Sequence, residues 1–197
     1  MRVSPSHRLL FVHVPKTGGS SVEQLLDQRL ADSTPMSPRH APLHNALKRS
    51  PELAGYWTFG FVRNPWARMV SWWSMVSQRP EDHPQMATNE LWQDVRAHAA
   101  DFEQFVLEAP ERHLRLRRPQ VDYLTQRGGR HADFIGRTET LAADVRAMLA
   151  RFELAGGEVP HENASEHADY REYYTAKSRQ HVAELFRSDI AAFGYDF

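Results

Sequence analysis

The residues most suited to chemistry form a short run near the start of the chain, where one lysine, two glycines and three hydroxyl side chains follow a proline: Pro15, Lys16, Thr17, Gly18, Gly19, Ser20 and Ser21. The glycines allow a sharp turn whose backbone N–H groups point at an anion. The lysine adds a full positive charge, and the hydroxyls can donate hydrogen bonds. The run predicts a site for a phosphate-like group, although an ordinary turn in which the glycines only relieve strain also fits the run alone.

The run differs from a Walker A loop, in which a Lys-Ser/Thr pair follows the second glycine and opens the helix. In this chain the lysine precedes both glycines. The flanking residues predict the elements that would hold the turn. Residues 9–14 are apolar and rich in β-branched and aromatic side chains, which favours a buried strand. Beyond Ser21, apolar residues recur at helical spacing, so the N-terminus of a helix would add its own N–H groups to the site.

A second strand, turn and helix follow at residues 57–76. Residues 57–62 predict a buried strand, Arg63-Asn64-Pro65 ends it, and residues 66–76 have helical character, with Pro65 at a position that suits the first turn. Ligands of open α/β sheets bind beyond the carboxyl ends of the strands, where Arg63 would lie. Together with Ser71, two turns into the helix, Arg63 predicts a second anion site.

The rest of the chain continues this alternation. A third strand is expected at residues 132–136, and helices are expected at residues 89–99, 101–108 (ending before Pro110), 119–124, 138–154 and 178–193. Strands that alternate with helices predict an α/β fold with three layers, in which helices flank a central, mainly parallel sheet. The length of 197 residues suits a single domain over residues 1–197.

Composition narrows the function. A net charge of -1 gives no overall field that would attract nucleic acid or a membrane surface. The chain has no cysteine, which excludes disulfides and thiol catalysis. We see no signal peptide and no membrane span, and we expect a cytoplasmic protein. The basic cluster of Arg112, Arg115, Arg117 and Arg118 could bind an acidic acceptor, but such a run is more often a solvated face. The sequence carries no signal for an oligomeric state.

The two anion sites, in this order and at this separation, resemble the sulfotransferases that use 3'-phosphoadenosine 5'-phosphosulfate (PAPS). The likeness is greatest to the carbohydrate and bacterial branch, whose signatures read Pro-Lys-Thr-Gly-Gly-Thr/Ser-Ser and Val-Arg-Asn/Asp-Pro followed some six residues later by Ser. It continues through residues 135–139 and 190–197, so it spans nearly the whole chain. The resemblance implies a P-loop nucleotide-hydrolase-like fold.

The resemblance also implies roles by position. The turn from Lys16 to Ser21 would hold the 5'-phosphosulfate, with Lys16 near the bridging oxygen that becomes the leaving group. Arg63 and Ser71 would bind the 3'-phosphate. Arg137 and the loop that carries Asn163 and Ser165 would close over the nucleotide. No metal is expected, since sulfuryl carries less negative charge than phosphoryl, so a lysine and backbone dipoles can stabilise its transfer. The pairs His40 with His44 and His161 with His167 lack a third ligand at a matching spacing.

The acceptor hydroxyl needs a general base. His40 is the first candidate, because related sequences carry a His-Ala pair here and an imidazole takes up a proton near neutral pH. His44 is the second candidate, and Glu23 and Glu139 are further alternatives. The substrate side is expected to include His44, Gln120 and Tyr123.

We therefore expect a PAPS-dependent O-sulfotransferase that uses direct in-line transfer, with PAP as product and a carbohydrate, a glycolipid or a hydroxylated small molecule as acceptor. One alternative is an ATP-dependent P-loop phosphotransferase, which the lack of a clear Walker B strand ending in Asp disfavours. The other is a non-catalytic nucleotide-binding or partner-binding module on the same fold.

Overall fold

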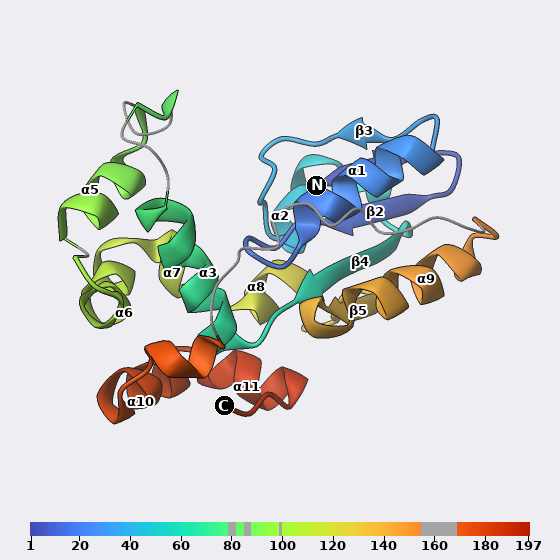
Figure 1. Cartoon of the computed structure of the whole chain (residues 1–197). Helices are drawn as coiled ribbons and strands as arrows, with labels where there is room; N and C mark the ends of the chain where they lie inside the picture. The colour runs from blue at the N-terminus through green and yellow to red at the C-terminus, as the bar shows by residue number, and fades with distance from the viewer. Residues whose placement is uncertain (79–81, 85–87, 99, 155–168) are drawn as a thin grey trace. The chain divides into compact units, whose positions relative to one another are not determined.

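A computed structural model describes residues 1–78, 82–84, 88–98, 100–154 and 169–197. The chain divides into two compact units (Figure 1). The first comprises Met1–Arg63 and Gln120–Ala164, and the second comprises Asn64–Pro119 and Ser165–Phe197.

The first unit is built on a five-stranded sheet with the order β3-β1-β2-β4-β5. The central strand β2 (Leu9–Val12) pairs in parallel with β4 (Trp57–Val62), which pairs in parallel with β5 (Phe134–Arg137). On the other side of β2, the short strands β1 (Arg2–Ser4) and β3 (Thr34–Pro35) add an antiparallel edge. The three parallel strands confirm the expected sheet, while the antiparallel edge was not predicted.

Helices cover both faces of this sheet. The helices α1 (Gly19–Arg29) and α9 (Leu141–Arg151) pack on one face, where their apolar residues form a core with Phe59 and Phe61. Side chains alternate along a strand, so Gly60 faces the other way and lies against Leu124 of α8 (Gln120–Leu124). The helix α2 (Leu43–Arg49) packs beside α8, and the 3₁₀ turns η1 (Pro51–Leu53) and η2 (Thr138–Thr140) complete this unit. The three-layer α/β prediction is therefore confirmed.

The second unit is helical in its described part. Its elements are α3 (Pro65–Ser77), α5 (Glu90–His98), α6 (Phe102–Arg112), α7 (Leu114–Arg117), η3 (Tyr170–Tyr173), α10 (Ala176–Leu185) and α11 (Arg187–Phe193). Asn64 caps α3, since its side chain accepts the backbone N–H groups of Trp66 and Ala67 at 3.0 and 3.3 Å. Pro65 occupies the start of α3, as predicted.

Two predicted helix boundaries in this unit were wrong. The helix α6 does not end before Pro110 but runs through it to Arg112, with Ala109 and Pro110 both buried. Proline loses one backbone hydrogen bond, and here the burial of this turn compensates for that loss. The predicted helix at residues 178–193 is two helices, which meet at Phe186, a fully buried residue with a non-helical backbone.

Two arginines of the basic cluster form ion pairs within the second unit. Arg112 pairs with Asp94 at 2.9 Å and with Glu108 at 3.5 Å, and Arg117 pairs with Glu111 at 3.7 Å. These contacts favour the interpretation of a solvated, charge-paired face. None of the helices in the described part of the chain has both the length and the apolar character that a membrane span requires.

Gly60 offers a test of the packing between β4 and α8. A Cβ atom at this position would lie 2.5 Å from Cδ2 of Leu124 and 2.9 Å from the carbonyl oxygen of Val12. We expect Gly60→Ala to lower the free energy of unfolding by about 1–3 kcal/mol, as overpacking does. Denaturant unfolding measures the change. Gly60→Ala should also destabilise a Leu124→Ala background, because the backbone of Val12 cannot move aside. An unchanged stability of Gly60→Ala in the wild-type background would contradict this packing.

Candidate functional site

Three cationic residues follow three neighbouring strands at one edge of the sheet. Arg63 comes directly after β4, Arg137 ends β5 opposite Val62, and Lys16 lies in the turn after β2. The carboxyl ends of parallel strands share an edge, so the structure brings these residues to the same edge of the first unit. This is the edge at which the sequence predicted an anion site.

The turn of residues 15–21, called the glycine turn below, has the backbone that such a site requires. Gly18 has φ 74° and ψ 10° and immediately precedes α1, and Lys16 also has a positive φ of 71°. Gly18, the N-cap residue of α1, has no side chain that could cap the helix, and the N–H groups of the first turn face the glycine turn. The hydroxyl of Thr17, a residue only 1% exposed, donates to the carbonyl oxygen of Val14 at 2.9 Å. The Thr17 side chain thus holds the turn in shape.

Gln120 holds Arg63 in place. Its amide nitrogen donates to the carbonyl oxygen of Arg63 at 2.8 Å, and its amide oxygen accepts the Arg63 N–H at 2.9 Å. The Gln120 side chain is fully buried, and Tyr123 is only 2% exposed. The sequence led us to expect both residues on the substrate side. The structure shows Gln120 as a support for the Arg63 backbone and Tyr123 as part of the interior, and their role on the substrate side stays a prediction.

Arg137 is exposed at the end of β5, and its N–H donates to the carboxylate of Asp144 at 2.7 Å. The next residue, Thr138, donates its hydroxyl to the carbonyl oxygen of Val62 at 3.0 Å, which joins the ends of β4 and β5. A Cβ atom on Gly18 would lie 3.0 Å from the side chain of Leu141, the first residue of α9. The glycine turn and the end of β5 are therefore neighbours.

Of three other predicted residues, one belongs to the second unit and two fall outside the described part of the chain. Ser71 is buried on α3, in the second unit. Asn163 and Ser165 lie outside the described residues. The roles expected for these three residues stay predictions.

His40 lies beside the strand that leads into the glycine turn. Its Nδ1 atom is 3.0 Å from the carbonyl oxygen of His13, and the two imidazole rings meet edge to face with centroids 4.5 Å apart. A carbonyl oxygen can only accept, so Nδ1 carries the hydrogen and the basic lone pair of the neutral ring is on Nε2. His40 is half-buried. His44, also half-buried, lies in α2.

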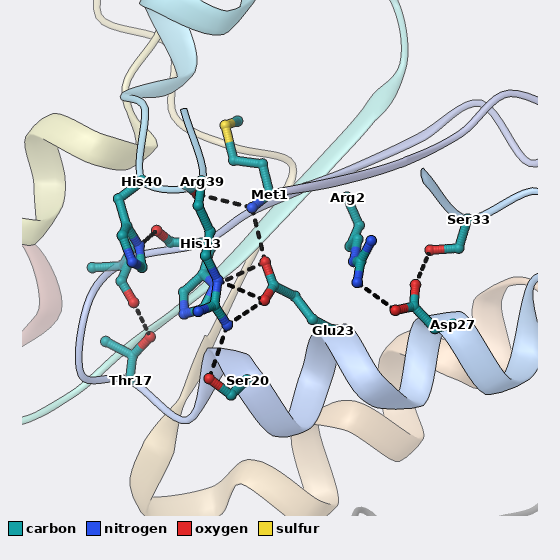
Figure 2. A network of polar contacts seen from close by, with 11 residues as sticks. Met1, Arg2, His13, Thr17, Ser20, Glu23, Asp27, Ser33, Arg39 and His40 are labelled. Carbon is teal, nitrogen blue, oxygen red and sulfur yellow. Dashed lines mark hydrogen bonds and ion pairs between the residues drawn. The ribbon is translucent and has the colours of Figure 1, made fainter. Parts of the chain in front are cut away.

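Two functional candidates were missed by sequence reasoning, namely His13 and Arg39, which meet at Glu23 (Figure 2). Arg39 donates to Oε2 of Glu23 through Nε at 2.8 Å, and Nδ1 of His13 lies 2.9 Å from Oε1. The α-amino group of Met1 also contacts Oε1 at 2.9 Å. The only signal was that His13 is a polar residue within an apolar run.

Glu23 is not placed to act as the base. Its side chain is only 9% exposed, and both carboxylate oxygens are engaged. Burial by itself would raise the pKa of Glu23, but the contacts with His13 and Arg39 lower it far below its usual range. Burial lowers the pKa of His13, and the contact with Glu23 opposes this only in part. The site therefore contains a buried carboxylate anion and a neutral imidazole. The other alternative base, Glu139, is exposed in η2.

Within the part of the chain that the structure describes, no three His, Cys, Asp or Glu side chains are grouped so as to hold a metal ion.

Comparisons with known proteins agree with this geometry at the level of the family. A family model described as "Sulfotransferase family" matches residues 1–196. Among solved structures, mouse sulfotransferase SULT7A1 complexed with PAP matches with 13% sequence identity, covering 95% of this chain and 85% of that chain, at a TM-score of 0.42. The comparison with curated proteins found no match.

The buried histidine predicts a pH dependence of stability. The pKa of His13 is lowered from 6.5 in the folded state, so the unfolded chain binds the proton more tightly, and stability falls as the pH drops below about 6.5. The pKa of Glu23 is lowered from 4.5, so its contribution is lost only as the pH drops further, below about 4.5. Denaturant unfolding at pH 7, 6 and 5 measures the slope.

His13→Gln should flatten this slope between pH 7 and pH 5, whatever it does to stability at pH 7. His131→Gln, which changes an exposed histidine, serves as the control and should leave the slope as it is. Equal slopes in wild type and His13→Gln would show that His13 is not held neutral in the folded state.

Proposed function

Because this chain belongs to the sulfotransferase family, we propose that it transfers a sulfuryl group from PAPS to a hydroxyl group of a carbohydrate, a glycolipid or a hydroxylated small molecule. The observation that carries the proposal is the shared edge of β2, β4 and β5, which gathers Lys16, Arg63 and Arg137 beside the start of α1. A donor with phosphate at both ends needs two separate anion sites, and the glycine turn and Arg63 supply them in one unit.

The residues present fit this donor. The glycine turn combines a lysine with backbone N–H groups at an uncapped helix start, which suits the 5'-phosphosulfate. Arg63 supplies a planar guanidinium for the 3'-phosphate, and the Gln120 amide fixes the backbone from which that side chain extends. Arg137, exposed at the end of the neighbouring strand, would add a third positive charge. Ser71 is also proposed to bind the 3'-phosphate, because it follows Arg63-Asn64-Pro65 at the spacing of the family signature.

The reaction we propose is a single in-line displacement. The acceptor oxygen forms a bond to sulfur while the bond between sulfur and the bridging phosphate oxygen breaks. The hydroxyl proton passes to Nε2 of His40, the nitrogen left basic by the bond from Nδ1 to the His13 carbonyl oxygen. The electron pair of the broken bond stays on the 5'-phosphate of PAP, where Lys16 and the helix N–H groups stabilise the charge.

The donor assignment is tested by calorimetry with PAP and with ATP plus Mg²⁺. We expect wild type to bind PAP and to prefer it to ATP plus Mg²⁺. Arg63→Ala should weaken PAP binding about 10- to 100-fold, because it removes charge-assisted hydrogen bonds to phosphate.

The role of Lys16 is tested by steady-state kinetics, in which Lys16→Ala should lower kcat with PAPS by about 10²- to 10³-fold. Arg49→Ala, which removes an exposed charge at the end of α2, is the matched control and should change neither quantity.

The outcomes separate the rival functions. A preference for ATP plus Mg²⁺ would identify a phosphotransferase. Binding of PAP without sulfate transfer to any member of a panel of sugars, glycolipids and phenols would identify a non-catalytic nucleotide-binding module.

The choice of base is tested by comparing His40→Ala with His44→Ala. Loss of a general base costs about 10²- to 10⁴-fold in rate, so His40→Ala should lower kcat within that range and leave the Kd for PAP unchanged. His44→Ala should keep most of the rate, since His44 is proposed only to contact the acceptor, and its effect should fall on the KM for the acceptor. The reverse pattern of rates would make His44 the base.

A further inference from the structure

Two consecutive residues attach the loop between α1 and α2, residues 30–42, to the site (Figure 2). Arg39 reaches α1, where its guanidinium donates to Glu23 and also, through Nη2, to the hydroxyl oxygen of Ser20 at 2.9 Å. His40 reaches the residue after β2, where it donates to the carbonyl oxygen of His13. The proposed base therefore lies next to Arg39, which forms an ion pair with α1.

The geometry of Arg39 is specific. Ser20 and Glu23 are three residues apart on α1, so they lie on the same face of its first two turns. One planar guanidinium spans both side chains, with Nε and Nη2 on Oε2 of Glu23 and Nη2 also on Ser20. A lysine has no such fork and could make only part of this arrangement.

The ion pair between Arg39 and Glu23 is strong because Glu23 is buried. Its carboxylate is largely buried, whereas the Arg39 side chain is 53% exposed, so the loop supplies a solvent-accessible cation to an anion held in the interior. Among the described residues, the other charged or titratable groups that contact this carboxylate are His13 and the α-amino group of Met1, which also donates to the carbonyl oxygen of Arg39 at 2.8 Å. Removing a partner from a buried charge leaves it poorly compensated, so the loop is strongly biased toward this position.

We propose that Arg39 and Glu23 are positioning residues, whose ion pair holds the His40 imidazole against the glycine turn with Nδ1 bonded to His13 and Nε2 directed toward the acceptor. This inference deepens the proposed function and rests on it. Arg39 acts through its neighbour and takes no part in the transfer itself.

The first test is kinetic. Arg39→Ala and Glu23→Gln should each lower kcat about 10-fold or more while the Kd for PAP stays within about twofold of wild type, and Arg39→Lys should restore only part of the rate. Because both substitutions break one pair, the double variant should be no slower than the slower single variant, whereas independent effects would multiply. Arg29→Ala, which removes an exposed arginine from the last turn of α1, is the control and should keep the wild-type rate.

The second test does not use activity. Nitrogen NMR of ¹⁵N-histidine-labelled protein reports which ring nitrogen carries the hydrogen, and His40→Asn identifies the His40 signals among those of the 11 histidines. In wild type, His40 should be in the Nδ1–H form. In Arg39→Ala, the population of this form should fall, because the bond to His13 is no longer enforced.

The outcomes distinguish the inference from the function on which it rests. If wild type transfers no sulfate, the proposed function fails. If wild type is active but Arg39→Ala keeps its rate and the His40 tautomer, the positioning role is overturned. A loss of PAP affinity in Arg39→Ala would also overturn it, since Arg39 would then contact the donor directly. Multiplicative effects in the double variant would show that the two residues act separately.

Discussion

Parallel pairing of β2, β4 and β5 is the constraint on which the site depends. It places Val12 beside Gly60 and Val62 beside Arg137, so that the residues following each strand emerge at one edge. Chain segments more than 40 residues apart thereby deliver positive charge to the same place. An antiparallel partner would have reversed one strand and sent its cation to the far edge. The antiparallel strands β1 and β3 are on the other side of β2, where they extend the sheet without contributing to this cluster.

A buried carboxylate organises the other half of the site. Glu23 lies on the first helix after the glycine turn, yet it faces inward, toward His13 and Arg39. Burying a charge is costly unless it is paired, so the helix start, the end of β2 and the loop of residues 30–42 must come together around it. The two histidines of this half of the site also differ in their surroundings. His13 is held neutral in the interior, whereas His40 stays half-exposed with a defined tautomer.

The sequence predicted what depends on local pattern. The strand at residues 57–62 was predicted at its observed bounds, because its apolar run has clear boundaries, and the third strand was displaced by only one or two residues. The strands β1 and β3 have only three and two residues and exist through pairing, of β1 with β2 and of β3 with β1, which no local pattern reveals.

Within the site, the glycine turn and Arg63 could be predicted from their sequence motifs. The contact between Glu23 and Arg39 joins residues 16 apart, and a glutamate in an amphipathic helix normally indicates the solvent face. The bonds of Gln120 were not predicted either, since their partner is a backbone 57 residues away.

Besides the ion pair of Glu23 and Arg39, several parts of the site are held by side chains that bond to backbone. Such bonds run from Thr17 to Val14, from Gln120 to Arg63, from Thr138 to Val62 and from His40 to His13. Every one of them ends on a residue at or just beyond the end of β2 or β4. Bonds of this kind set the direction of the chain itself, so the positions of the glycine turn and Arg63 do not depend on a ligand being bound. In the proposed transfer, groups held in place before the reaction would need no reorganisation when charge develops on the leaving oxygen, which is the condition under which a lysine and a helix start would stabilise that charge most effectively.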